Sequence, residues 1–253
     1  MGDLADRAGT LRALHRPGDP VVLPNAWDPP SARRLAQTGV AALATTSVGV
    51  AEALGYEDGG FTPPELMLAA VGRIAAAVEL PVTADLENGY GLPADELVAG
   101  MLEAGVVGLN LEDTDHSTRS LADPEAHAEW LASVKEAGRA AGVDVVLNAR
   151  VDVFLRAAPD ADPDEVVEDG IRRARRYAEA GADCVYPIAA RGRDAIRRLV
   201  EGAGAPVNIV AVPGGLGRSE LAELGVARVS FGGGLADAAN DAAAAQVEDF
   251  LGR

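Results

Sequence analysis

Short apolar runs alternate with amphipathic stretches along the whole chain. Eight runs are apolar almost throughout, as expected of strands that are buried on both faces. They occupy residues 20–26, 40–46, 80–86, 106–112, 143–150, 182–188, 206–212 and 226–231. Between and after these runs, apolar residues recur at spacings of three and four, which predicts helices. The predicted helices span residues 30–38, 63–78, 93–104, 124–141, 164–180, 191–202, 217–224 and 235–251.

This alternation is typical of a parallel sheet wrapped by helices. A glycine precedes four of the predicted strands, in AQTGVAAL, LEAGVVGL, AEAGADCV and AELGVARV, and such a glycine can end a helix in the left-handed conformation. A further helix, predicted over residues 3–14, is expected to cover the bottom of a barrel. We therefore predict an α/β fold with one (β/α)8 TIM-barrel domain over residues 1–253, since no linker divides the chain. The alternative is a doubly wound open sheet.

Length and composition agree with one barrel and argue against several classes of partner. A chain of 253 residues has the usual size of a single α/β barrel. No run approaches the roughly 20 apolar residues that span a bilayer, and the N-terminal segment lacks the apolar region of a secretory signal. The formal net charge of −17 argues against nucleic acid and anionic membranes as partners. The single cysteine, Cys184, favours a reducing cytoplasm as the location.

Carboxylates gather where two neighbouring predicted strands end, which is where α/β barrels build their active sites. Asp85 and Glu87 alternate at the end of the third strand, so both can face the barrel mouth, and Glu112 ends the fourth strand. Three converging carboxylates repel one another unless a hard divalent cation joins them. The sequence therefore predicts a Mg²⁺ site, with Mn²⁺ as an alternative ion. The competing interpretation is an ordinary ion pair between Glu87 or Glu112 and Arg150.

Arg150 ends an otherwise apolar fifth strand, where a charge is costly unless it is paired. Its guanidinium is suited to bind a substrate carboxylate or phosphonate, and it can also pair with Glu112. The segment 45–49 is small and hydroxylated, so its backbone N–H groups can approach an anionic ligand, or it closes a tight turn. Asn208, in the seventh strand, can face the barrel centre as a site residue or as a satisfied core amide.

The histidines and the cysteine are less informative than the carboxylates. His15 follows the first helix and is interpreted as structural. His116 lies in the long segment after the fourth strand, where it either reaches the mouth or stays solvated. His127 falls in the first turn of the next helix and is expected on its solvated face. Cys184 is interpreted as a small core residue.

Six segments of the sequence, in this order, resemble the isocitrate lyase / phosphoenolpyruvate mutase superfamily. They are PNAWD, TTSVGVAEALGYEDG, VTADLENGYG, GLNLED, LNARVD and PVNIVAVPGG, and they extend over residues 20–235. The combination of the VTADLENGYG and GLNLED segments is the specific part of the resemblance. The resemblance implies a Mg²⁺ ion bound mainly through Asp85, with Glu87, Glu112 and Asp58 joining directly or through water.

The resemblance also implies how a substrate binds and how the chain assembles. Backbone and hydroxyl groups of Thr46, Ser47 and Val48, together with Arg150, are expected to hold a small anionic 2-oxo acid. Asn25 and Trp27, both in the PNAWD segment, are expected to contribute to substrate binding, as is Asn208 in the PVNIVAVPGG segment. Members of the superfamily commonly form tetramers that exchange their last helix. Residues 235–251 are therefore expected to pack on another subunit of a homo-oligomer, either a dimer or a tetramer.

Two departures from the superfamily pattern affect the expected chemistry. The stretch LEDTDHSTRSLADPEAH stands where the lyase branch carries a cysteine motif and the mutase branch a lysine- and asparagine-bearing loop. Glu87 stands where other branches mostly place aspartate. A general acid must then come from Tyr90, His116, Asp115 or bound water, and we take Arg150, Tyr90 and His116 as the candidate catalytic residues.

The function that agrees best with these residues is a magnesium-dependent lyase that cleaves a carbon–carbon bond of a small 2-oxo or 2-hydroxy di- or tricarboxylate. A cation and nearby donors stabilise the enolate that forms. The first alternative is carbon–phosphorus chemistry on phosphonopyruvate or hydrolysis or decarboxylation of oxaloacetate. The second alternative is a barrel that binds a 2-oxo acid without catalysis, because the usual loop residues are replaced.

Overall fold

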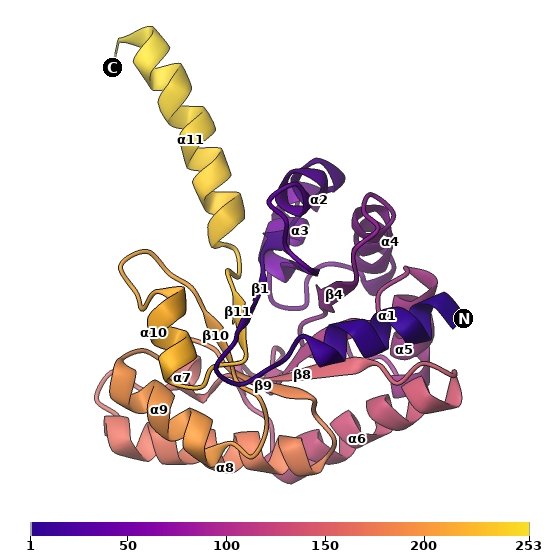
Figure 1. Cartoon of the computed structure of the whole chain (residues 1–253), viewed down its shortest axis with the longest axis vertical. Helices are drawn as coiled ribbons and strands as arrows, with labels where there is room; N and C mark the ends of the chain where they lie inside the picture. Colours follow the sequence, from indigo (N-terminus) through magenta and orange to yellow (C-terminus); the bar gives the residue numbers. More distant parts are fainter. Residues whose placement is uncertain (1, 253) are drawn as a thin grey trace.

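Parallel strands close into a barrel in the computed structural model, which describes residues 2–252 (Figure 1). The first barrel strand is divided at Pro24 into β1 (Val21–Leu23) and β2 (Asn25–Ala26). The other barrel strands are β3 (Leu43–Thr45), β4 (Val82–Asp85), β5 (Gly108–Glu112), β8 (Val146–Val151), β9 (Cys184–Pro187), β10 (Asn208–Val210) and β11 (Arg228–Ser230). Each lies inside one of the predicted apolar runs or within one residue of it.

The pairing of the strands forms a complete ring. The hydrogen-bonded order is β2-β3-β4-β5-β8-β9 in one sheet and β1-β11-β10 in another, and every one of these pairs is parallel. A parallel bridge between Val185 of β9 and Val207, the residue before β10, joins the two sheets. Because β11 pairs with β1, the predicted (β/α)8 barrel is confirmed, and the alternative of an open sheet is wrong.

Helices surround the barrel close to their predicted positions. They are α2 (Pro29–Ala36), α4 (Pro64–Ala75), α5 (Ala94–Glu103), α6 (Pro124–Ala140), α8 (Pro163–Glu179), α9 (Arg193–Gly202) and α10 (Arg218–Glu223). Capping residues explain where three of these helices begin. Asp28, Asp123 and Asp162 each cap the N-terminus of a helix whose first residue is proline. The recurring glycines have the expected conformation, because Gly105 and Gly181 have φ values of 77° and 102°.

The N-terminal helix α1 (Gly2–Ala13) covers the bottom of the barrel, as predicted. Leu11 is fully buried and lies so close to Gly108 that a Cβ on that glycine would stand 2.8 Å from the leucine side chain. Arg12 donates to the carboxylate of Asp183 at 2.7 Å and to the carbonyl oxygen of Asp144 at 2.7 Å. These contacts close the end of the barrel opposite the strand carboxyl ends.

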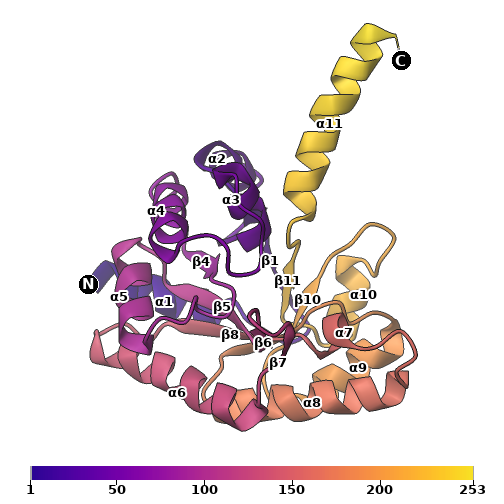
Figure 2. The ribbon, with the colours of Figure 1, turned by 180° about the vertical axis from the view of Figure 1, so that it is seen from behind.

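Three short elements were not predicted, and all of them lie at the barrel mouth. They are α3 (Ser47–Leu54), α7 (Val153–Arg156) and an antiparallel hairpin of β6 (Thr114–Asp115) and β7 (Ser120–Leu121). Figure 2 shows the hairpin beside α7. These elements are too short, and α3 is too uniformly small and apolar, to give a clear periodic signal.

The last helix, α11 (Gly234–Leu251), leaves the barrel and projects away from it (Figures 1 and 2). Its outer half exposes Val247, Phe250 and Leu251, with 58%, 90% and 57% of their surfaces accessible. Within residues 2–252 no helix is long and apolar enough to cross a membrane.

Candidate active site

Asp85 and Glu87 lie at the mouth of the barrel, where β4 ends. Asp85 is the last residue of the strand, and its backbone N–H donates to the Thr45 hydroxyl at 3.1 Å. Glu87 lies beyond the strand in the left-handed region, with φ of 50°, so a turn and not strand alternation brings it to the mouth. The Gly60 N–H donates to Glu87 Oε2, whereas Glu87 Oε1 is buried without a hydrogen-bond partner among the described residues.

The two carboxylates are held in an environment that disfavours their charges. Burial, opposed by Arg150 but assisted by Glu112 and Asp58, raises the pKa of Asp85 to about 6. Burial and the charge of Asp58, opposed by His116, raise the pKa of Glu87 to about 7. Asp58 itself is exposed. The site thus gathers more negative charge than the surrounding side chains neutralise.

His116 is placed over this cluster by the β6–β7 hairpin. Its Nε2 lies 3.0 Å from Glu112 Oε1 and 3.3 Å from Glu87 Oε2. The ring packs on the backbone of Gly60, because a Cβ there would meet the imidazole at 3.4 Å. The close contact with the Glu112 carboxylate outweighs the opposing effect of burial and raises the pKa of His116. Of the two positions that the sequence allowed, His116 therefore occupies the one at the mouth.

Tyr90 and Tyr186 add two hydroxyl groups to the same region. Burial, together with the charges of Glu87 and Asp85, raises the pKa of Tyr90, which keeps its hydroxyl protonated. Tyr186 lies in β9 opposite Arg150 in the strand register, and burial raises its pKa to about 12. Tyr186 was missed from the sequence, although the strand-end position used for the other residues would have selected it.

Arg150 connects Glu112 to a second carboxylate that the sequence argument had not used. Its Nη1 contacts Glu112 Oε2, while Nε and Nη2 donate to the two oxygens of Asp152 at 2.7 and 3.1 Å. Burial alone would lower the pKa of Arg150, but Glu112 and Asp152 reverse that effect and raise it. The ion pair with Glu112, one of the two interpretations left open, is therefore present, and the guanidinium also borders the mouth beside Asp85.

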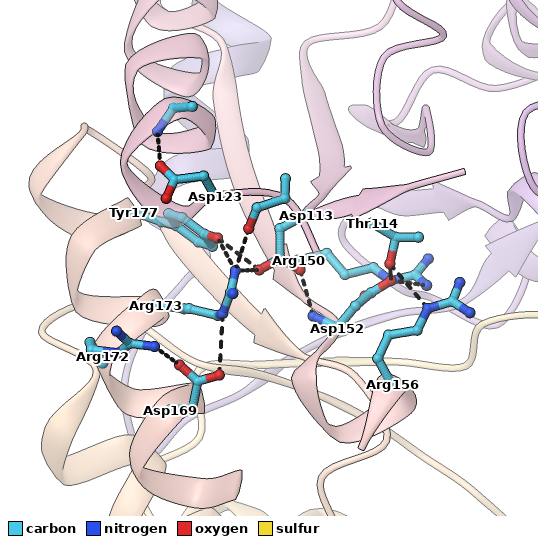
Figure 3. A network of polar contacts seen from close by, with 12 residues as sticks. Asp113, Thr114, Asp123, Arg150, Asp152, Arg156, Asp169, Arg172, Arg173 and Tyr177 are labelled. Carbon is cyan, nitrogen blue, oxygen red and sulfur yellow. Dashed lines mark hydrogen bonds and ion pairs between the residues drawn. The ribbon is translucent and has the colours of Figure 1, made fainter. Parts of the chain in front are cut away.

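A further layer of polar contacts lies behind Arg150 (Figure 3). The carboxylate of Asp113, fully buried, accepts hydrogen bonds from the Asp152 N–H, from Arg173 and from the Tyr177 hydroxyl. Arg173 and Tyr177 come from α8, on the outside of the barrel. None of these groups was singled out from the sequence, because nothing in a single chain reveals which buried charges will meet.

Thr46, Ser47 and Val48 form the start of α3, whose N-terminal end faces the mouth. Thr46 precedes the helix in an extended conformation, and its carbonyl oxygen accepts the first helical hydrogen bond, from the Val50 N–H at 3.1 Å. The preceding N–H groups have no partner within the helix, and the helix dipole concentrates positive potential there. Thr46 and Ser47 are buried, and the role of this end in binding an anion stays a prediction.

Three other predicted substrate-binding residues have structural contacts. Asn25 donates to the Thr45 carbonyl oxygen and accepts from the Phe231 N–H, so its amide ties neighbouring strands together. Asn208 is fully buried and exchanges hydrogen bonds with the Ser230 hydroxyl at 3.2 and 3.3 Å. Trp27 lines a groove of about 190 Å³ with residues of α2, α3 and α4. Their roles in substrate binding remain predictions.

The remaining histidines and the cysteine are all buried. His127 was expected on a solvated helix face, which is wrong: it is only 8% exposed, and its ring packs edge-on against Tyr177 at 5.0 Å. The helix is covered at that point by α8, which the periodicity of α6 alone does not reveal. His15 contacts the Leu11 carbonyl oxygen, and Cys184 is fully buried in the core, in agreement with the structural roles expected for them.

The candidate cation ligands approach one another without forming a finished cage. In the described part of the chain, no three histidine, cysteine, aspartate or glutamate side chains are arranged as ready ligands of one metal ion. Glu112 is not free to bind an ion in this arrangement, because His116 contacts its Oε1 and Arg150 contacts its Oε2. Among the buried candidate cation ligands, Asp85 and Glu87 Oε1 have the fewest contacts with other side chains.

Comparison with known families gives a match over nearly the whole barrel. The family model described as phosphoenolpyruvate phosphomutase matches residues 11–251. An uncharacterized protein of Mycobacterium tuberculosis strain H37Rv is 37% identical over 220 residues, which cover 87% of this chain and 80% of that protein. The 2-methylisocitrate lyase of Shewanella oneidensis is 30% identical over 216 residues, covering 82% of this chain and 72% of the lyase.

Solved structures show the same likeness in three dimensions. A suggested phosphonomutase from Burkholderia cenocepacia J2315 is 40% identical with a TM-score of 0.92, covering 97% of this chain and 99% of that one. The structure of a 2,3-dimethylmalate lyase is 26% identical with a TM-score of 0.84, covering 97% of this chain and 87% of the lyase. The similar proteins thus include enzymes with different reactions on small carboxylates.

Proposed function

The chain belongs to the phosphoenolpyruvate phosphomutase family of the isocitrate lyase / phosphoenolpyruvate mutase superfamily, and we propose that it is a magnesium-dependent lyase that cleaves a carbon–carbon bond. The family consists of lyases and mutases, so the chain is an enzyme of this type. The proposed substrate is a small 2-oxo or 2-hydroxy di- or tricarboxylate that reacts through an enolate. The observation that carries the proposal is the pair of buried carboxylates, Asp85 and Glu87, beside Arg150 and the free end of α3.

The residues at the mouth fit a divalent cation. The pKa values of Asp85 and Glu87 are raised to about 6 and about 7 because burial and neighbouring carboxylates disfavour their charges. A cation would remove that penalty and give Glu87 Oε1 its missing partner. Asp85, Glu87 and Glu112 would hold the ion, with Asp58 nearby, and all-oxygen donors suit Mg²⁺ or Mn²⁺. When bound, the ion polarises the 2-oxo group and stabilises the enolate oxygen.

Two positive features of the chain suit the anionic end of the substrate. The Arg150 guanidinium is directed toward Glu112 and Asp152, and it retains N–H groups beyond those contacts. The N-terminal end of α3 supplies N–H groups from Ser47 and Val48. Together they can fix a carboxylate so that the adjacent carbonyl lies beside Asp85, which is the alignment that favours reaction.

The side chains available for proton transfer limit which reactions the site can catalyse. The sequence has one lysine, Lys135, which is buried near the bottom of the barrel and paired with Asp183 at 2.8 Å. Cys184 is buried in the core. Imine formation with a lysine and acid catalysis by a cysteine therefore have no suitable residue at the mouth. His116, Tyr90 and Tyr186 remain, and their raised pKa values keep all three able to donate a proton. Of these, His116 and Tyr90 are the proposed donors.

The proposed cleavage follows from this set of donors. The substrate hydroxyl loses its proton to a water molecule at the mouth, and its carbon becomes the carbonyl carbon of the first product. The electron pair of the neighbouring carbon–carbon bond passes into the carboxylate-bearing fragment, which leaves as an enolate. His116 or Tyr90 then protonates the enolate carbon. Each residue has to be reprotonated from solvent or from the departing hydroxyl proton to complete the cycle.

Carbon–phosphorus bond chemistry is the second candidate function. It is favoured by the matched family model and by the 40% identity to a suggested phosphonomutase. Arg150 would serve a phosphonate as well as a carboxylate. We also propose a homo-oligomer in which α11 packs on a neighbouring subunit, because Phe250 and Leu251 are exposed in the single chain.

Proton NMR of the purified protein with Mg²⁺ tests the function directly. The panel is oxaloacetate, isocitrate, 2-methylisocitrate, 2,3-dimethylmalate and phosphonopyruvate, each with the Asp85→Ala variant as a control. Cleavage of one of the hydroxy acids by the wild type alone supports the lyase, whereas turnover of oxaloacetate alone would contradict it. Turnover of phosphonopyruvate alone would replace it with the second candidate, and binding without turnover of any compound would contradict both.

A further inference from the structure

Asp152 fixes the orientation of the Arg150 side chain. It is fully buried and receives two parallel hydrogen bonds from the guanidinium, from Nε at 2.7 Å and from Nη2 at 3.1 Å. A bidentate pair of this kind sets the plane of the guanidinium as well as its distance. The direction in which Arg150 presents its remaining N–H groups to the mouth therefore depends on where Asp152 is held.

Asp113 in turn fixes Asp152, through the backbone. Asp113 Oδ1 accepts the Asp152 N–H at 2.8 Å. Its other oxygen, Oδ2, accepts from the Tyr177 hydroxyl at 2.7 Å and from Arg173 Nη1 at 3.0 Å. In Figure 3 these contacts run from α8, through Asp113, to Asp152 and Arg150. Both Asp113 and Tyr177 are fully buried, so no bulk water replaces a lost contact.

Hydrogen bonds of the same network also hold both ends of the β6–β7 hairpin, which carries His116. At the start of the hairpin, the Thr114 hydroxyl donates to Asp152 Oδ2 at 2.6 Å. At its end, the Ala122 N–H donates to the Asp113 carbonyl oxygen at 2.8 Å, and the Ala122 carbonyl oxygen accepts from Arg173 Nη1 at 3.0 Å. The buried Asp113 carboxylate, held by two side chains of α8, therefore positions both Arg150 and His116.

We propose that Asp113, held by Tyr177 and Arg173, is a positioning residue that sets the orientation of Arg150 toward the anionic end of the substrate. The inference rests on the proposed function, because it assumes that Arg150 binds substrate. Asp113 does not line the mouth, and all its side-chain contacts go to the chain itself. Misplacing a binding group by about 1 Å can cost about a hundredfold in rate, so a residue of this kind affects the reaction without contacting the substrate.

The test measures oxalate binding in the presence of Mg²⁺ by isothermal titration calorimetry. Oxalate is a planar dianion with the shape and charge of a 2-oxo acid enolate. Tyr177→Phe removes one hydrogen bond to Asp113 and is expected to weaken binding about threefold, and Asp113→Asn about tenfold. Asp169→Asn is the matched control, since Asp169 contacts Arg173 from the outer side at 3.5 Å and is expected to leave the affinity unchanged.

Combining Tyr177→Phe with Arg150→Lys distinguishes a positioning role of Asp113 from a general loss of structure. In the Arg150→Lys background, Tyr177→Phe is expected to cause no further loss of oxalate affinity, because the group that it positions is gone. A purely structural role would give the same loss in both backgrounds and would contradict the inference. Tyr177→Phe carries this test even where Asp113→Asn fails to fold.

A crystal structure of the Tyr177→Phe variant, and of Asp113→Asn where it folds, distinguishes the remaining outcomes. The inference expects Arg150 to lose at least one of its two bonds to Asp152. If the bidentate pair is unchanged, or if the variants bind oxalate as the wild type does while Arg150→Lys does not, the inference is wrong. If Arg150 has moved but Arg150→Lys binds oxalate normally, the positioning stands and the proposed binding role of Arg150 fails.

Discussion

His116 Nε2 lies between two carboxylates, 3.0 Å from Glu112 and 3.3 Å from Glu87. Glu112 is the last residue of β5, Glu87 follows the end of the adjacent β4, and the histidine comes from a short hairpin. Because both glutamates are proposed cation ligands, the ring nitrogen proposed for proton transfer lies directly beside the proposed cation site. His116 also lies in the stretch of sequence where the lyase branch is expected to carry a cysteine motif.

Replacing His116 is expected to slow the chemical step more than it weakens binding. His116→Gln removes the proposed proton donor and should lower kcat by about a hundredfold or more, in the range found for general acids, with a smaller change in KM. Steady-state kinetics on the substrate found in the NMR panel measures both constants. Thr118→Ala, on the exposed turn of the same hairpin, is the control. Unchanged kcat in His116→Gln would transfer the role to Tyr90.

Replacing Arg150 with lysine is expected to act mainly on substrate affinity. Lysine keeps the charge but loses the planar pair of donors that Asp152 orients, and it should weaken binding of a carboxylate by about 1–3 kcal/mol. The measurement is KM, or the dissociation constant of oxalate with Mg²⁺ present. Equal affinity of the variant and the wild type would show that Arg150 supports Glu112 and Asp152 without binding substrate.

His127 gives a prediction for stability that does not depend on the active site. Burial and then the charge of Arg173 lower its pKa to about 4, so between about pH 6.5 and pH 4 the unfolded chain takes up a proton that the folded chain does not. The contribution of neutral His127 is therefore complete above that range and is lost as the pH falls. His127→Phe should be more stable than the wild type by about 2 kcal/mol at about pH 5, relative to their difference near pH 7.5.

Urea unfolding of both proteins at the two pH values measures this difference. Comparing variant with wild type matters, because Asp85 and Glu87 have raised pKa values and change stability in the opposite sense over the same range. Phenylalanine keeps a ring against Tyr177 and removes only the titration. A difference between the proteins that is the same at both pH values would show that His127 does not remain neutral in the folded chain.

The exposed end of α11 predicts that assembly depends on its apolar side chains. Phe250→Glu puts a charge on a residue that is 90% exposed in the single chain, so it should leave folding of the barrel intact. If α11 packs on a neighbouring subunit, the charge is buried on assembly and should dissociate the oligomer. Sedimentation velocity measures the change in mass, with Asp249→Ala on the same turn as the control. The same mass for Phe250→Glu and the wild type would place the interface elsewhere.

The fold could be predicted from the sequence because its signal is repeated. Each strand is apolar on both faces, and each helix shows its own period, so even imprecise boundaries lead to the same barrel. The strand-end rule then brings Asp85, Glu112 and Arg150 to one mouth, as the structure shows. The short α3, which is uniformly small and apolar, and the β6–β7 hairpin, whose strands have two residues each, carried no comparable pattern and were missed for that reason.

The contacts between side chains were the part that sequence could not supply. Asp113 and Asp152 follow directly after strands, but their partners Arg173 and Tyr177 are 60 or more positions away from Asp113. Only the packing of α8 against the barrel brings them together. His127 was placed on the correct turn of α6 and on the wrong face, because the neighbour that buries it is also α8.

The central claim is that Asp85, Glu87 and Glu112 hold a divalent cation, and Mn²⁺ titration followed by electron paramagnetic resonance tests it most directly. The wild type is expected to bind one Mn²⁺ ion per chain, and Mg²⁺ should displace it. Asp85→Asn should weaken that binding by at least about tenfold, since loss of even an outer-shell partner has such an effect, while Asp95→Asn on the exposed start of α5 should not. Equal Mn²⁺ affinity in Asp85→Asn and the wild type would contradict the claim.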